Sequence, residues 1–172
     1  GTRVFEVDMQ GECDLQVNLD ELAVLPFESE SYDVVCAFDV LEHLENFHLL
    51  NDEIYRVAKD YVLISLPNSA CEVFYGPFWN RKKNETDTDA GVFSTFYGLP
   101  LESPRDRHRW WLYFQDIVRY YYHFAKKNDA DVEFWTPRLS FKKRLFKLFF
   151  GSHLYYTFFC QHVWVKLKKR PR

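Results

Sequence analysis

The chain has 172 residues, of which 47% are hydrophobic, so it is long enough to bury the core of a single domain. Its formal net charge of −3 gives no electrostatic reason to expect nucleic-acid binding. No uninterrupted apolar run reaches the roughly 18 residues that a membrane-spanning helix needs. We therefore expect one domain over residues 1–172, located in the cytoplasm, with no nucleic acid among its partners.

The first 67 residues predict strands alternating with a helix. The strands are expected at 4–7, 15–19, 34–38 and 61–66, and the last two are continuous apolar runs. Between them, residues 41–58 keep apolar side chains at helical spacing. A strand, helix and strand in this order favour a right-handed parallel crossover. We therefore expect an α/β fold with one mostly parallel sheet, in which 34–38 is the buried central strand.

The second half begins with a segment that lacks periodicity. Residues 69–109 are rich in glycine, proline and charged side chains, and a segment of this length is typical of an insertion or a lid. A helix is expected next, then a short strand, a basic and aromatic helix, and a final antiparallel strand, at 115–127, 132–135, 140–150 and 155–167. The basic helix, 141–150 above all, either covers the sheet or makes peripheral contact with a membrane surface.

The four cysteines are widely spaced, at positions 13, 36, 71 and 160, with no Cys-x-x-Cys pair. Disulfide frameworks and zinc ribbons show tighter spacing, so we expect thiols in a reducing compartment. We assign no metal ligands from the sequence.

Three segments carry a family resemblance: Leu25-Pro26-Phe27, Tyr32-Asp33-Val34-Val35 and Asp39-Val40-Leu41-Glu42-His43. They resemble the middle of class I S-adenosylmethionine-dependent methyltransferases of type 11, clearly over residues 3–68 and loosely beyond. The resemblance implies a Rossmann-like sheet. It also implies methyl transfer from S-adenosylmethionine to a small-molecule, sugar or lipid acceptor.

The resemblance also implies which residues bind the cofactor. Asp8 would accept hydrogen bonds from both ribose hydroxyls, since a carboxylate offers two acceptor oxygens to a vicinal diol; otherwise it caps a turn. Asp20, or else Glu21, would accept from the adenine amino group. Leu22 either packs on the adenine or belongs to the core. Beside the methionine portion, the resemblance places Phe38 and Asp39.

On the acceptor side, Glu42 and His43 begin the expected helix, and in similar proteins they face the cofactor pocket or the substrate. His43 is a candidate general base, because an imidazole with a pKa of about 6.5 takes up a proton readily; otherwise it lines the pocket. His108 is a second candidate base. Its neighbours Arg107, Arg109 and Trp110 either cradle a polar acceptor or anchor the insertion on the sheet edge.

The chain departs from the family at one motif. It contains no Gly-x-Gly, whereas the family's glycine-rich loop lets the backbone approach the cofactor closely. The strand and helix that carry this loop are missing with it, which leaves residues 4–7 and 34–38 without their shared neighbour. We expect an N-terminally truncated fragment, inactive alone, whose partner is the missing N-terminal segment of the same protein. The alternative is a degraded scaffold that serves as a non-catalytic interaction or membrane-surface protein.

Overall fold

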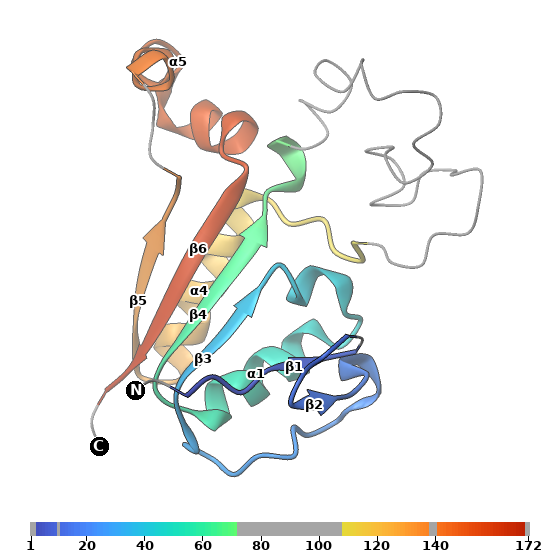
Figure 1. The fold of residues 1–172 in the computed structure, drawn as a ribbon. Helices are drawn as coiled ribbons and strands as arrows, with labels where there is room; N and C mark the ends of the chain where they lie inside the picture. Colours follow the sequence, from blue (N-terminus) through green and yellow to red (C-terminus); the bar gives the residue numbers. More distant parts are fainter. Residues whose placement is uncertain (1–2, 10, 72–107, 138–140, 171–172) are drawn as a thin grey trace, which may run out of the picture.

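The computed structural model describes residues 3–9, 11–71, 108–137 and 141–170 (Figure 1). The expected insertion at 69–109 lies almost wholly outside this part of the chain, and Arg107 lies outside it too. All four cysteines are thiols rather than disulfides, as predicted.

The strands form two sheets rather than the single sheet that we expected. The larger sheet has the spatial order β3 (Tyr32–Phe38), β4 (Ala58–Pro67), β6 (His162–Lys169) and β5 (Ala130–Trp135) (Figure 1). Strands β3 and β4 are parallel, while β6 runs antiparallel to both β4 and β5. A separate parallel pair consists of β1 (Val7–Asp8) and β2 (Leu15–Gln16). The α/β class is confirmed, and so is the parallel β3–β4 pair.

Strand β3 lies at the edge of the larger sheet in the described part of the chain, so its expected central position was wrong. Only Ala37 among its residues is buried, because the strand has a neighbour on one side. Strands β1 and β3 share no ladder here, although Phe5 packs its ring against Tyr32 with centroids 5.9 Å apart.

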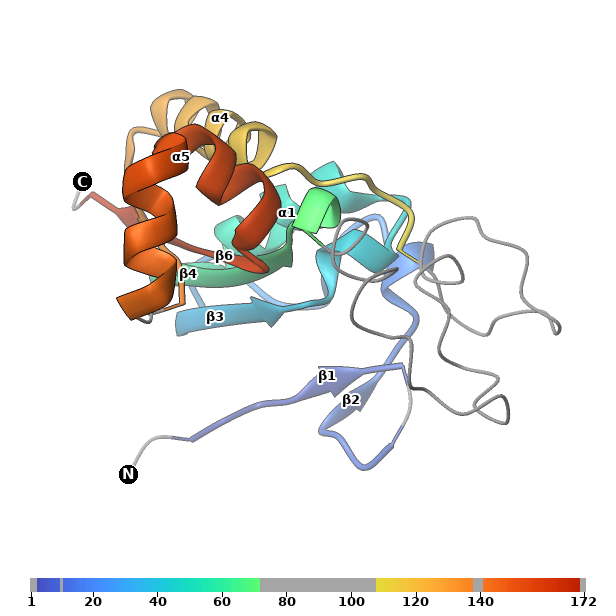
Figure 2. The ribbon, with the colours of Figure 1, turned by 90° about the horizontal axis from the view of Figure 1, so that it is seen from above.

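Two helices cover one face of the larger sheet, α1 (Phe47–Val57) and α4 (Phe114–Lys127) (Figure 2). The core lies between them and the sheet, where alternate residues of β4 and β6 are buried. Val62 pairs with Leu167, Ile64 with Val165 and Leu66 with Val163, and all six are fully buried. Because strand side chains alternate between faces, the intervening residues point to the opposite side of the sheet.

The expected helix at 41–58 is interrupted at its start. Residues Leu41–His43 form a short 3₁₀ helix, η2, and α1 begins only at Phe47. Tertiary hydrogen bonds hold the intervening turn, because Asn46 Nδ2 donates to the carbonyls of Leu19 and Leu22. Leu19 begins another short 3₁₀ helix, η1 (Leu19–Glu21), and Leu22 follows it. We had expected a strand to continue to residue 19.

The expected final strand at 155–167 was wrong in its first half. Helix α5 (Phe141–Phe159) includes residues 155–159, and β6 begins at His162. The helix is kinked at Gly151, whose φ of 81° is accessible to glycine at no steric cost. Its end is fixed by the buried Asn68, whose Nδ2 lies within 2.9 Å of the carbonyl oxygens of Tyr156, Thr157 and Cys160.

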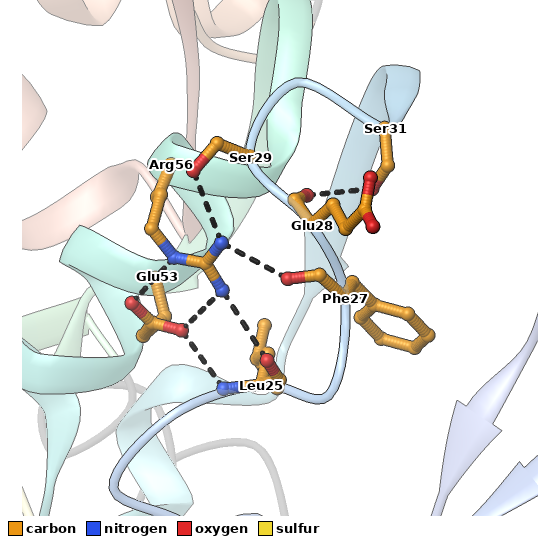
Figure 3. Close-up of polar contacts among 7 residues, drawn as sticks. All are labelled: Leu25, Phe27, Glu28, Ser29, Ser31, Glu53 and Arg56. Carbon is orange, nitrogen blue, oxygen red and sulfur yellow. Dashed lines mark hydrogen bonds and ion pairs between the residues drawn. The ribbon is translucent and has the colours of Figure 1, made fainter.

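The loop that contains Leu25-Pro26-Phe27 is clamped onto α1 (Figure 3). Arg56 donates to the carbonyls of Leu25 and Phe27, at 3.2 and 2.9 Å, and Glu53 accepts from the Leu25 amide at 2.8 Å. Glu53 and Arg56 also pair directly at 2.7 Å. The hydrogen bond from Arg56, helped by the Leu25 amide, lowers the pKa of Glu53 from its ordinary 4.5. This clamp sets where the chain enters β3.

Candidate functional site

The candidate site begins where β3 ends. Asp39 adopts a left-handed backbone with φ of 51°, which aspartate tolerates better than most residues, and so turns the chain sharply into η2. Its amide donates to Ser65 Oγ at 3.0 Å, and the Ser65 hydroxyl donates to Asp39 Oδ1 at 2.9 Å. His162 Nδ1 lies 3.6 Å from the same carboxylate oxygen. Contacts from β4 and β6 thus fix the turn.

Beyond this turn, three chemically capable side chains meet: Glu42, His43 and His108. The Glu42 side chain is 1% exposed, and its Oε1 lies 3.9 Å from His43 Nε2. The rings of His43 and His108 meet edge to face, with centroids 4.7 Å apart. One carboxylate oxygen and one nitrogen from each imidazole all lie within 4.8 Å of one another. We call these three residues the Glu42 cluster.

The segment that begins with His108 is held against η2 and against Ser69, which follows β4, by hydrogen bonds. The Arg109 amide donates to the Glu42 carbonyl at 2.8 Å, and Trp110 Nε1 donates to the Leu44 carbonyl at 2.6 Å. The Ser69 amide donates to the Leu112 carbonyl at 2.8 Å, and the Leu112 amide donates to Ser69 Oγ at 3.0 Å. The residues that follow His108 therefore hold it beside Glu42, although the two are far apart in sequence.

Arg109 and Asp20 are held by contacts with the protein itself. The Arg109 guanidinium lies 3.0 Å from Glu45 Oε1 and 3.3 Å from Asp20 Oδ2. The other oxygen of Asp20 accepts from the Glu45 amide at 2.8 Å. These contacts fit the anchoring alternative for Arg109. Glu21, the second candidate for the adenine, accepts from Asn18 Nδ2.

The remaining predicted residues fall in two places. Phe38 is 45% exposed on the face of the sheet opposite α1, with its ring centroid 5.2 Å from that of Trp164. Leu22 packs partly buried against the core. Asp8 is exposed in the separate β1–β2 pair. The structure thus brings Phe38 and Asp39 to the same sheet edge as the Glu42 cluster, while Asp8 belongs to the other sheet.

The core behind the cluster is aromatic and apolar. Tyr121 is fully buried and donates its hydroxyl hydrogen to Asn51 Oδ1 at 3.0 Å. Burial raises the pKa of Tyr121 well above its ordinary value, and electrostatic interactions with Tyr120 and Glu42 raise it further. The Glu42 carboxylate therefore borders a region of low polarity, where an isolated charge is costly.

The sequence analysis missed Ser65 and His162, the two side chains that contact Asp39. A signal existed for Ser65, because it is the one aliphatic hydroxyl inside the apolar run at 61–66. No comparable signal marks His162, since its proximity to Asp39 depends on the antiparallel register of β6 beside β4.

Comparisons with known proteins concern the family and the fold. Residues 6–64 match the family model of a methyltransferase domain. A candidate methyltransferase from Bacillus halodurans C-125 has a similar structure, with a TM-score of 0.51 and 16% identity over 99% of this chain and 83% of that one. The methyltransferase domain of bacterial CtHen1-CN aligns at a TM-score of 0.48 and 12% identity, over 80% of this chain. The present chain spans 53% of that domain's length. No curated protein matches the sequence significantly.

Proposed function

We propose that the protein transfers a methyl group from S-adenosylmethionine to an acceptor nucleophile, because residues 6–64 match the family model of a methyltransferase domain, in agreement with the resemblance seen in the sequence. The acceptor proposed is a small molecule, a sugar or a lipid. The chain spans about half the length of one similar methyltransferase domain, so this activity is proposed for the protein as a whole.

The observation that carries the proposal is the gathering of polar groups after β3. Asp39, Glu42 and His43 follow the carboxyl end of the parallel strand β3, where open α/β sheets bind their ligands, and His108 lies beside them. The turn at Asp39 and the bonds around Arg109 hold these groups before any ligand arrives. Such preorganisation is what alignment of two reactants requires.

The residues present fit part of S-adenosylmethionine. The exposed carboxylate of Asp8 suits the ribose diol, and the exposed ring of Phe38 beside Asp39 suits the methionine portion. The chain has no glycine-rich loop for the carboxypropyl end. We propose that the missing N-terminal segment of the same protein brings this loop on a strand between β1 and β3. The chain alone would then be inactive.

In the proposed reaction, S-adenosylmethionine supplies a methyl group on a sulfonium, ready for direct displacement. The chain's own contribution is to orient the acceptor and to receive its proton. His43 and His108 are the two candidate bases, and the nearby Glu42 carboxylate would stabilise the imidazolium formed on His43. Orientation without a base is the simpler alternative, since a sulfonium is already reactive.

The test is label transfer by the complete protein. Methyl-labelled S-adenosylmethionine is incubated with the protein and with separate metabolite, glycan and lipid extracts. The proposal expects label in one extract, and less label with His43→Gln than with His123→Gln, an exposed histidine on α4. Absence of label from all three extracts, under conditions where the protein is folded, would contradict it.

One observation favours the alternative of a membrane-surface protein. Helix α5 exposes Leu145, Leu148 and Phe149, to 46%, 78% and 76%. Lys147 lies among them, and a basic helix with an apolar face is typical of an interfacial helix. In the part of the chain that the structure describes, no helix combines the length and apolar character needed to cross a membrane. For the enzyme we propose the cytoplasm as its location.

A further inference from the structure

We propose that Glu42, His43 and His108 form a binding site for a divalent transition-metal ion of the zinc type. The sequence analysis assigned no metal ligands and placed His43 and His108 only as candidate bases. These two histidines are far apart in sequence, and the fold brings them together, since it places His108 against η2. The role of the metal described below rests on the proposed function, whereas metal binding does not.

The first argument is the spacing of the ligand atoms. Tetrahedral zinc, with bonds of about 2.0–2.1 Å to nitrogen and oxygen, holds its ligand atoms about 3.4 Å apart. In this structure one ligand atom from each of the three residues lies within 4.8 Å of the other two. Glu42 Oε1 lies 3.9 Å from His43 Nε2. The ligand atoms would have to move closer together when the ion binds.

The second argument is the identity of the ligands. Two imidazoles and one carboxylate are a recurrent set in catalytic zinc sites, where three protein ligands leave one coordination position open. Imidazole nitrogen favours zinc and its neighbours in the periodic table over magnesium and calcium, which prefer oxygen ligands. The set therefore points to zinc or a similar ion.

The third argument is charge. The Glu42 side chain is 1% exposed, and a positive charge beside a buried carboxylate is favourable. A divalent ion with two neutral imidazoles and one carboxylate leaves a net positive charge at the site.

This site defines the acceptor class more narrowly. The open coordination position would take a hydroxyl oxygen of the acceptor and lower the pKa of that hydroxyl. Its proton passes to solvent, an oxygen lone pair forms the bond to the methyl carbon, and the electron pair of the broken sulfur–methyl bond stays on sulfur. The metal would then replace His43 and His108 as the group that activates the acceptor.

The test is metal binding by the whole chain, without S-adenosylmethionine or acceptor. Chelator-treated protein is titrated with Zn²⁺ in a calorimeter, and with Co²⁺ while the visible spectrum is recorded. We expect one site per chain, with cobalt d–d bands and no thiolate-to-cobalt band. Glu42→Gln, His43→Gln and His108→Gln should each weaken Zn²⁺ binding by more than about 100-fold, since even outer partners of metal ligands cost 10–100-fold. His123→Gln, the matched control, should change nothing.

Three results would overturn the inference: no Zn²⁺ binding, a cysteine signature in the cobalt spectrum, or affinity that survives all three substitutions. Where a variant fails to fold, X-ray absorption spectroscopy of the wild-type zinc complex decides. Two imidazole ligands and no sulfur ligand would support the inference, and any other set of protein ligands would overturn it. Metal binding without methyl transfer would contradict the proposed function alone. Methyl transfer by protein that binds no metal would contradict this inference alone.

Discussion

Glu53 and Arg56 join helix α1 to the loop before β3. Their ion pair predicts that the stability of the protein depends on pH. Glu53→Gln should lower the free energy of unfolding at neutral pH by about 1.5–3 kcal/mol, the range for hydrogen bonds to a charged group. The Glu53 side chain is 13% exposed and that of Arg56 is 30% exposed, so solvent screens the pair in part. Urea denaturation measures the difference.

The sign of the pH effect follows from the direction of the shift. The pKa of Glu53 is lower in the folded protein than its ordinary 4.5, so its contribution is complete above pH 4.5 and disappears as the pH falls through the lowered pKa. Wild type and variant should therefore converge in acid. Glu28→Gln, in the exposed part of the same loop, serves as the control. A destabilisation that stays constant with pH would contradict the role given to the charge.

Whether the sequence predicts such a contact depends on how far apart the two residues are in the sequence. Glu53 and Arg56 are three residues apart on a predicted helix, so their pairing could be anticipated. Their bonds to the Leu25 and Phe27 backbone could not, because these depend on the path of a loop. The same holds for the Glu42 cluster, in which Glu42 and His43 were singled out as neighbours, while their meeting with His108 required the fold.

Asn68 fixes the end of α5, and it does so through a neutral amide group that can donate hydrogen bonds. Its amide nitrogen contacts three carbonyl oxygens, so Asn68→Asp would place a carboxylate against three acceptors in a buried position. We expect a loss of about 3 kcal/mol or more, against about 1–3 kcal/mol for Asn68→Ala, which removes only the donor. Thermal unfolding compares the two. If Asp were tolerated better than Ala, the amide would not be the donor.

The exposed apolar side chains of α5 do not support the core. Replacing Leu148 and Phe149 by Glu should change the free energy of unfolding by less than about 0.5 kcal/mol, as for most surface positions. In the membrane-surface alternative, the same double variant should lose co-sedimentation with anionic lipid vesicles that the wild type shows. If the wild type does not co-sediment with vesicles, the membrane-surface alternative is wrong. If the double variant is strongly destabilised, these side chains pack against the protein.

The elements differ in how well the sequence predicted them. The apolar runs of β3 and β4 and the periodicity of α4 identified those elements to within a few residues. Two boundaries failed because tertiary bonds override local propensity. Asn46 holds the turn before α1, and Asn68 holds residues 156–160 at a helix end.

For the molecule as a whole, the division into two sheets is the feature that most constrains function. Strand β3 is the edge of the larger sheet in the described residues, and β1, which carries Asp8, pairs only with β2 there. A strand inserted between β1 and β3 would join the two sheets and bring Asp8 to the same carboxyl edge as Asp39. We expected β1 and β3 to lack a shared neighbour because the chain contains no Gly-x-Gly motif. That expectation came from the family resemblance rather than from any periodicity.

Calorimetric titration of S-adenosylmethionine into the protein, with the proposed N-terminal segment included, tests the proposed function most directly. We predict one binding site per chain. Asp8→Ala should weaken binding by about 1.5–3 kcal/mol, the scale of a charge-assisted hydrogen bond. Asp33→Ala, an exposed aspartate in β3, should bind as the wild type does. Folded complete protein that takes up no S-adenosylmethionine would contradict the proposed methyl transfer, and an affinity unchanged by Asp8→Ala would remove that residue from the site.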